Sequence, residues 1–145
     1  YLVDEKHVLI LFCHKGSKLG KMVRGRIELG SMGWAMRSKL KKEFAPTKAL
    51  LVSDESHLHR GHAGVADAST PETHFNVFCV SESFAGKSLV ARHRAVNTLF
   101  ADEFDQGLHA LSMSLHTSEE AEKKGDKLKL DFEDAEQQES IEPGL

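Results

Sequence analysis

A strand pattern, a helix pattern and a second strand pattern follow one another between residues 74 and 115, and this succession constrains the fold most. Residues 74–80, HFNVFCV, form an apolar run that predicts a strand. Residues 108–115, LHALSMSL, predict a second strand, because the large apolar residues Leu111, Met113 and Leu115 alternate with the small residues Ala110, Ser112 and Ser114. A strand–helix–strand crossover is right-handed and sets its strands parallel. The segment therefore predicts a parallel strand pair with a helix packed against it.

The helix expected between these strands begins after Ser88, whose hydroxyl suits an N-cap, and extends to about Phe104. One stripe of its surface collects most of its apolar side chains, which predicts the buried face. That stripe contains Leu89, His93, Val96, Phe100 and Phe104, with Leu99 at its edge. On the strand that follows, the side expected to face the core carries His109, Leu111, Met113 and Leu115.

Flanking elements complete a small α+β domain. A short amphipathic helix over Trp34–Phe44 is stopped by Pro46, and ALLVSD at 49–54 predicts a strand. The TSEE sequence at 117–120 has the capping-box form and starts a short last helix. The predicted order is α-β-β-α-β-α, a three-stranded mixed sheet packed against helices. Its first two strands would pair antiparallel across an unusually long loop at 55–72.

Charge is distributed unevenly along the 145 residues, whose formal net charge is −3. Residues 1–50 carry eleven Lys and Arg against four Asp and Glu, whereas residues 125–145 carry two against seven. We expect a disordered N-terminal extension at 1–31 (a leader or a cloning remnant), a folded domain at 32–124 and a disordered acidic tail at 125–145. No apolar run approaches the roughly 20 residues of a membrane-spanning helix, so no membrane partner is expected.

The sequence contains none of three common enzyme motifs. It has no GxSxG nucleophile elbow, no phosphate-binding loop and no GxGxxG fingerprint. Its two cysteines, Cys13 and Cys79, form no CxxC pair and no disulfide framework. Cys79 lies in an apolar run, which is typical of a small buried side chain. These observations favour a protein that is not an enzyme.

The long loop contains three histidines in a stretch of ten residues, His57, His59 and His62, and His109 opens the last strand. Each alone has an ordinary explanation as a solvated or hydrogen-bonded imidazole. Together, with a loop that can fold over a fixed imidazole at a strand end, they leave two interpretations open, solvated imidazoles and a metal site. Two imidazoles are too few to complete a tetrahedral site, so another molecule would have to supply the remaining ligands.

The remaining candidates have competing interpretations. His93 lies on the apolar face of its helix, which is typical of a core histidine with a hydrogen-bond partner. His74 opens its strand and is expected to be exposed. Arg92 and Arg94 flank His93 and form either a solvated, salt-bridging pair or a rim that binds carboxylates of a partner.

Several distinctive segments, in the right order, resemble the BolA family. They are MRSKLKKEFAPTKALLVSDES at 36–56, ETHF at 72–75, F-x-G-x-S-L-V-x-RHR at 84–94 and HALS at 109–112. The resemblance extends over about residues 36–122. It implies an α+β domain of the class II KH-like type without enzymatic activity.

The resemblance also implies a partner and a cofactor. BolA-like proteins pair with monothiol glutaredoxins of the CGFS type, and the heterodimer can hold a bridging 2Fe–2S cluster in cluster trafficking or iron sensing. The glutaredoxin cysteine and a glutathione thiol would bind one side, and imidazoles of this chain the other. Such a Rieske-like arrangement raises the reduction potential. The isolated chain would bind no cluster tightly.

Carried over by position, the strand ligand of the family corresponds to His109. The loop ligand follows D-E-S by three residues in Asp54-Glu55-Ser56-His57-Leu58-His59, which selects His59 and indicates the histidine-loop subclass. His57 and His62 remain alternative loop ligands. The expected partner-facing rim is Arg92, His93 and Arg94.

Other functions stay open at this point. KH-like domains often bind nucleic acid, and some bacterial BolA proteins are treated as transcriptional regulators, although the negative charge of this domain disfavours that role. A protein-interaction module without metal is a third interpretation, and a homodimer is an alternative assembly. The compartment is expected to be the cytoplasm or the mitochondrion, although plastid members of the family also exist.

Overall fold

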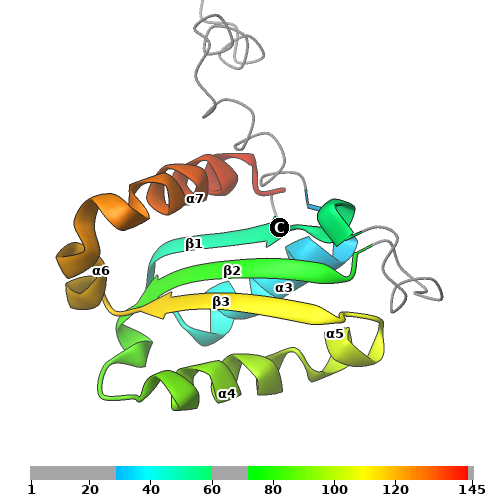
Figure 1. The fold of residues 1–145 in the computed structure, drawn as a ribbon, viewed down its shortest axis with the longest axis horizontal. Coiled ribbons are helices and arrows are strands. Elements are labelled where there is room, and N and C mark those ends of the chain that lie inside the picture. Colours follow the sequence, from blue (N-terminus) through cyan, green and yellow to red (C-terminus); the bar gives the residue numbers. More distant parts are fainter. Residues whose placement is uncertain (1–28, 60–71, 144–145) are drawn as a thin grey trace, which may run out of the picture.

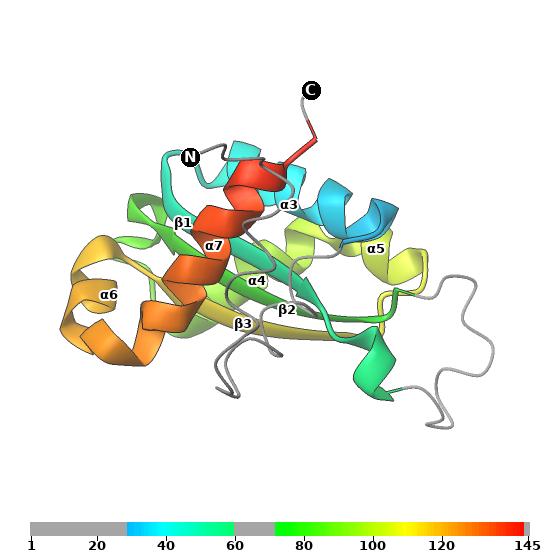
Figure 2. The same cartoon turned by 90° about the horizontal axis from the view of Figure 1, so that it is seen from above.

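The computed structural model describes residues 29–59 and 72–143 and contains a three-stranded sheet with helices on both faces (Figure 1, Figure 2). Strands β1 (Thr47–Asp54) and β2 (His74–Ser81) are antiparallel, and β3 (Ala110–His116) is parallel to β2. The order β1-β2-β3 places β1 and β3 at the two edges. The predicted α+β class with a mixed sheet is confirmed.

One face of the sheet packs against α3 (Ser31–Glu43) and α4 (Leu89–Leu99). Burying each large apolar side chain there contributes roughly 1.5–3 kcal/mol to stability. This main core includes Met36, Leu40, Val52, Val77, Cys79, Phe84, Val96 and Phe100.

The other face of the sheet packs against α6 (Ser118–Lys124), η4 (Gly125–Leu128) and α7 (Lys129–Ile141). Because β1 and β2 are covered on both faces, their middle segments are continuously apolar instead of alternating. This second core contains Ala49, Leu51, Phe78, Val80, Ala121, Leu128 and Ala135, with Phe132 packed against it.

Helix α7 lies where the sequence predicts a disordered acidic tail, so that prediction is wrong for residues 125–141. Figure 2 shows α7 crossing diagonally over β1. The Gln138 side chain is fully buried, and its amide accepts a hydrogen bond from Val52 N at 2.9 Å and donates one to Val52 O at 2.7 Å. Gln138 thereby takes the place of a neighbouring strand along the outer edge of β1.

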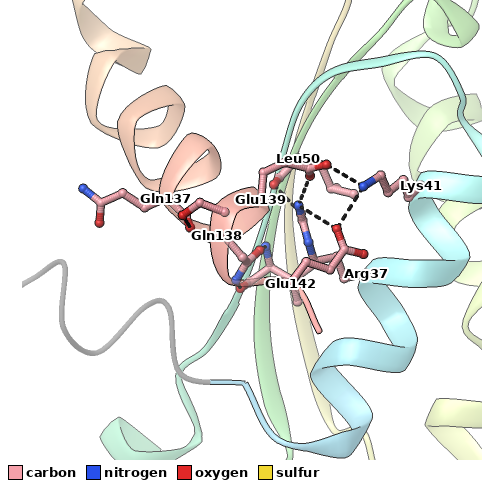
Figure 3. A network of polar contacts seen from close by, with 9 residues as sticks. Arg37, Lys41, Leu50, Gln137, Gln138, Glu139 and Glu142 are labelled. Atoms are coloured by element: carbon pink, nitrogen blue, oxygen red, sulfur yellow. Dashed lines mark hydrogen bonds and ion pairs between the residues drawn. The ribbon is translucent and has the colours of Figure 1, made fainter. Parts of the chain in front are cut away.

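Opposite charges join α3 to α7 (Figure 3). Arg37, which is fully buried, donates to Leu50 O at 2.5 Å and to the carboxylate of Glu139. Lys41 bonds Glu139 at 2.5 Å and Glu142 at 2.9 Å. The uneven charge of the sequence is therefore compensated in the fold, because part of the basic N-terminal third is paired with the acidic C-terminal segment.

Two helices replace the single helix predicted over 89–104, since α4 ends at Leu99 and α5 (Ala101–Asp105) follows. The Ser88 N-cap is confirmed, as is the capping box that starts α6. The predicted buried stripe is confirmed for only part of its length. Val96 and Phe100 are buried, whereas Leu89 is 58% and Phe104 37% exposed. None of the helices in the described part of the chain is long and apolar enough to cross a membrane.

Candidate functional site

Two histidines lie close together at one end of the sheet, where β1 ends and the other two strands begin (right side of Figure 1). The parallel register pairs His74 with Ala110, the residue that follows His109. The two imidazole ring centroids are 5.7 Å apart and the ring planes are inclined by 52°. The sequence predicts an exposed His74 with no role in the site, whereas the structure makes it half-buried and places it beside His109.

The spacing of this histidine pair suits a shared metal ion. A metal bound to an imidazole nitrogen at 2.0–2.1 Å lies roughly 3 Å from the ring centroid, so two imidazoles on one metal have centroids about 5–6 Å apart. Within residues 29–59 and 72–143, no group of three His, Cys, Asp or Glu side chains is arranged to hold a metal. Burial raises the pKa of the Cys79 thiol to about 12, so it offers no thiolate. The donor set fits half of a metal site.

His109 is exposed and precedes β3, so the prediction that it is the first core-facing residue of the strand is wrong. The N–H groups of both His109 and Ala110 donate to Thr73 O, at 2.8 and 3.0 Å. The alternation of the strand therefore begins only at Ala110. Leu108, which strict alternation over residues 108–115 would place on the opposite face, packs in the main core. The predicted core face is confirmed for Leu111, Met113 and Leu115.

The loop histidines begin at this same end of the sheet. His57 is exposed in η2 (Ser56–His59), the short helix directly after β1. The main chain of His59 ends that helix, and His62 lies outside the described residues. The choice of a loop ligand among His57, His59 and His62 stays a prediction.

The two ends of the long connection between β1 and β2 are fixed to each other at their base. The Ser56 hydroxyl donates to the carboxylate of Asp54 and accepts hydrogen bonds from Thr73 N at 2.8 Å and His74 N at 3.1 Å. One buried hydroxyl thus bonds the chain on both sides of the connection. The backbone of His74 is therefore held by the first residues that follow β1.

Glu72 fixes the start of α3 to the same region. Its carboxylate accepts hydrogen bonds from Met32 N at 3.1 Å and Gly33 N at 3.0 Å, at a helix end whose N-cap, Gly30, has no side chain. A Cβ atom at Gly30 would lie 2.5 Å from the carboxyl carbon of Glu72, so the glycine makes room for the carboxylate. Negative charge is favourable at a helix N-terminus. Sequence reasoning missed this contact because about 40 residues separate its partners.

Arg92 is buried inside the fold, with 7% of its surface exposed. Its guanidinium donates to Lys87 O at 3.0 Å and Leu115 O at 3.2 Å, and it forms two hydrogen bonds with the Glu120 carboxylate at 2.5 and 2.8 Å. These bonds join the N-terminal end of α4 to β3 and α6. Arg92 is therefore a structural residue, and the prediction that it faces a partner is wrong.

The other two residues of the predicted rim differ from Arg92. Arg94 is exposed and keeps the partner-facing interpretation as a prediction. His93 is half-buried, and its Nε2 has no hydrogen-bond partner within the part of the chain that the structure describes. Of the three residues predicted to face a partner, Arg94 remains an exposed candidate, and the half-buried His93 lies beside it in sequence.

Acid should weaken the bond between Arg92 and Glu120. The Arg92 guanidinium, and then Thr117 N, lower the pKa of Glu120 from 4.5 to about 2. A carboxyl whose pKa is lowered by folding stabilises fully above its unfolded-state pKa and loses that effect as the pH falls towards the folded-state value. Between about pH 6 and pH 2, we expect wild type to lose about 1–2 kcal/mol more unfolding free energy than Glu120→Gln. This is less than the full shift implies, because the Glu120 side chain is 42% exposed to solvent. Urea unfolding measures both proteins, and equal losses would contradict the assignment.

Comparisons with known proteins match the central part of the chain. A family model described as BolA-like protein matches residues 40–120. Protein BOLA1, chloroplastic, from Arabidopsis thaliana is 48% identical over 89 residues, which are 61% of this chain and 55% of that protein. The chain thus spans about half the length of this curated relative.

A bacterial relative and a solved structure match the same region. The DNA-binding transcriptional regulator BolA of Vibrio cholerae is 42% identical over 85 residues, covering 59% of this chain and 74% of the regulator. The BolA domain of SufE1 from Arabidopsis thaliana is similar in structure, with a TM-score of 0.57 and 46% identity, covering 64% of this chain and 99% of that domain. Helix α7 lies outside the residues matched by the family model.

Proposed function

Because this chain belongs to the BolA-like protein family, we propose that it is a non-enzymatic partner of a monothiol (CGFS) glutaredoxin and provides the nitrogen ligands of a shared 2Fe–2S cluster. The observation that carries this proposal is the His74–His109 pair, with ring centroids 5.7 Å apart at the end of the sheet. No third ligand completes a metal site within the described residues. A half-site of this kind suits a cluster whose other ligands come from a partner.

The chemistry of the two halves is complementary. Imidazoles of this chain would bind one iron, and the glutaredoxin cysteine with a glutathione thiol would bind the other, which is the ligand division of a Rieske centre. His109 is exposed, so a partner that carries the thiols can approach it. Since the ligands of the shared cluster are divided between two proteins, separation of the partners would release it. Such a cluster suits delivery to an acceptor or sensing of iron.

Reconstitution tests the proposal directly. The full chain is mixed with a CGFS glutaredoxin, glutathione, ferrous iron and sulfide under anaerobic conditions. We expect a one-to-one complex in size-exclusion chromatography, with a visible circular dichroism spectrum that differs from that of the glutaredoxin cluster alone. After reduction, the electron paramagnetic resonance spectrum should show that the cluster has nitrogen as well as sulfur ligands. A mixture whose spectra equal those of glutaredoxin alone would contradict the proposal.

Nucleic-acid binding is the second candidate function, and the name of the Vibrio cholerae relative favours it. KH domains grip the nucleic-acid backbone with a GXXG loop. Such sequences occur at 30–33 and 61–64, and the second lies outside the described residues. In the first, Met32 N and Gly33 N are already bonded to the Glu72 carboxylate, at the helix end where a phosphate would bind.

The nucleic-acid alternative has its own test. Fluorescence anisotropy with labelled duplex DNA is measured over a range of salt concentrations for wild type and Arg94→Ala. We expect weak binding with no difference between the two proteins. Tight binding that falls steeply with salt and is lost in Arg94→Ala would instead support the regulator function.

A further inference from the structure

Thr73 contacts both members of the histidine pair. It directly precedes His74, and its side chain oxygen Oγ1 lies 2.8 Å from His74 Nδ1. Its carbonyl oxygen accepts the N–H groups of His109 at 2.8 Å and Ala110 at 3.0 Å. One residue therefore contacts the ring of one histidine and the main chain of the other.

Thr73 is itself firmly fixed. Only 1% of its surface is exposed, and its N–H donates to the Ser56 hydroxyl at 2.8 Å. That hydroxyl is in turn bonded to the carboxylate of Asp54, at the end of β1. The contacts of Thr73 thus join β1, β2 and the start of β3, and each restricts a different group of the residue.

A hydrogen bond to one nitrogen of an imidazole determines how the other nitrogen is presented. In His74 the Nδ1 atom is engaged by Thr73, so a metal would bind through Nε2. A hydroxyl suits this task because it can donate to Nδ1 or accept from it. It therefore stays bonded to Nδ1 in both neutral tautomers, including the one in which Nδ1 carries the proton and Nε2 is the ligand.

We propose that Thr73 is the positioning residue of the histidine pair: its hydroxyl orients the His74 ring for coordination through Nε2, and its carbonyl fixes the distance to His109. This inference rests on the proposed function, since it assigns Thr73 a role towards the same shared cluster. The signature of the role is that the hydroxyl, and not the bulk of the side chain, is required.

The matched variants are Thr73→Val, which replaces the hydroxyl by a methyl group, and Thr73→Ser, which keeps the hydroxyl. The first measurement uses the metal-free chain without glutaredoxin. Nitrogen-15 spectra of the imidazoles are expected to show a hydrogen-bonded Nδ1 of His74 in wild type and Thr73→Ser, and to lose that bond in Thr73→Val. Slow amide exchange at His109 and Ala110 should persist in all three proteins, which controls for folding. Absence of the Nδ1 bond from wild type, or its persistence in Thr73→Val, would overturn the proposal.

The second measurement uses the reconstituted complex with glutaredoxin and glutathione. The rate at which the cluster is lost to a chelator is expected to rise about 10–100-fold in Thr73→Val and to stay near the wild-type rate in Thr73→Ser. Equal rates in wild type and Thr73→Val would overturn the positioning role. If wild type itself forms no cluster, the proposed function fails, and the spectra of the metal-free chain still decide whether the hydroxyl orients His74.

Discussion

His109→Ala is expected to abolish the mixed cluster formed with glutaredoxin while the fold stays intact. His109 is exposed, and its N–H would still donate to Thr73 in the variant. Exposed substitutions of this kind change the unfolding free energy by about 0.5 kcal/mol or less. Loss of a residue that supports a metal ligand lowers metal affinity roughly 10–100-fold. Loss of the ligand itself should weaken cluster binding by more than this. Visible circular dichroism of the reconstituted mixture measures the effect.

Two further variants identify the second ligand. His74→Ala tests the histidine that the structure places beside His109. His59→Ala tests the loop ligand that the family resemblance selects. If His74 completes the pair, its variant should match His109→Ala and His59→Ala should resemble wild type. The reverse result would show that the loop supplies the ligand in the complex.

Asp105→Asn is the matched control for these variants, because Asp105 is exposed and ends α5, just before His109. It should leave the cluster spectrum unchanged. A His109→Ala mixture with a wild-type spectrum would remove His109 from the ligand set. Loss of the signal in Asp105→Asn as well would mean that the whole turn, and not the imidazole, is required.

Gln138→Ala is expected to destabilise the protein by about 2–4 kcal/mol. The wild-type amide makes two hydrogen bonds with Val52, and its removal leaves the N–H and the carbonyl of that residue without these partners beneath α7. An unsatisfied buried polar group costs about 1–3 kcal/mol. Urea unfolding followed by far-ultraviolet circular dichroism gives the free energy, and hydrogen exchange at the Val52 amide reports on the local bond.

The neighbouring Gln137 provides a matched control, because it is the same residue type on the same helix and is exposed (Figure 3). Gln137→Ala should change the unfolding free energy by about 0.5 kcal/mol or less. If both variants unfold alike, α7 is not docked on β1 in solution. In that case the disordered tail that the sequence predicts would be the better description.

The sheet could be predicted from the sequence because its signals are local. Apolar runs mark the strands, Ser88 and the TSEE sequence mark helix starts, and the crossover sets β2 parallel to β3. The same crossover also predicts where His74 lies relative to His109. Parallel strands begin at the same end of a sheet, so residues at the two strand starts should meet. This consequence is missed when His74 is considered by itself.

Helix α7 could not be predicted because many of its contacts are polar and all of those with β1 and α3 are distant in sequence. Its buried residues include Asp134 and Gln138, which resemble solvated residues in a sequence pattern. The Arg37–Glu139 bond spans 102 positions. Arg92 was assigned to the surface for a similar reason, since its partner Glu120 lies on a different helix. Buried polar networks of this type depend on the assembled fold.

The contacts on β1 also limit how the sheet can grow. An exposed edge strand can pair with a strand of another molecule, and fibrils form when sheets extend through both edges. Arg37 and Gln138 occupy Leu50 O and both main-chain polar groups of Val52 on the outer side of β1. In the three-stranded sheet that the structure describes, addition of a strand is therefore restricted to β3. A sheet that is covered at one edge can add a strand only at the other, so the contacts of α3 and α7 on β1 disfavour open-ended assembly of copies of the chain.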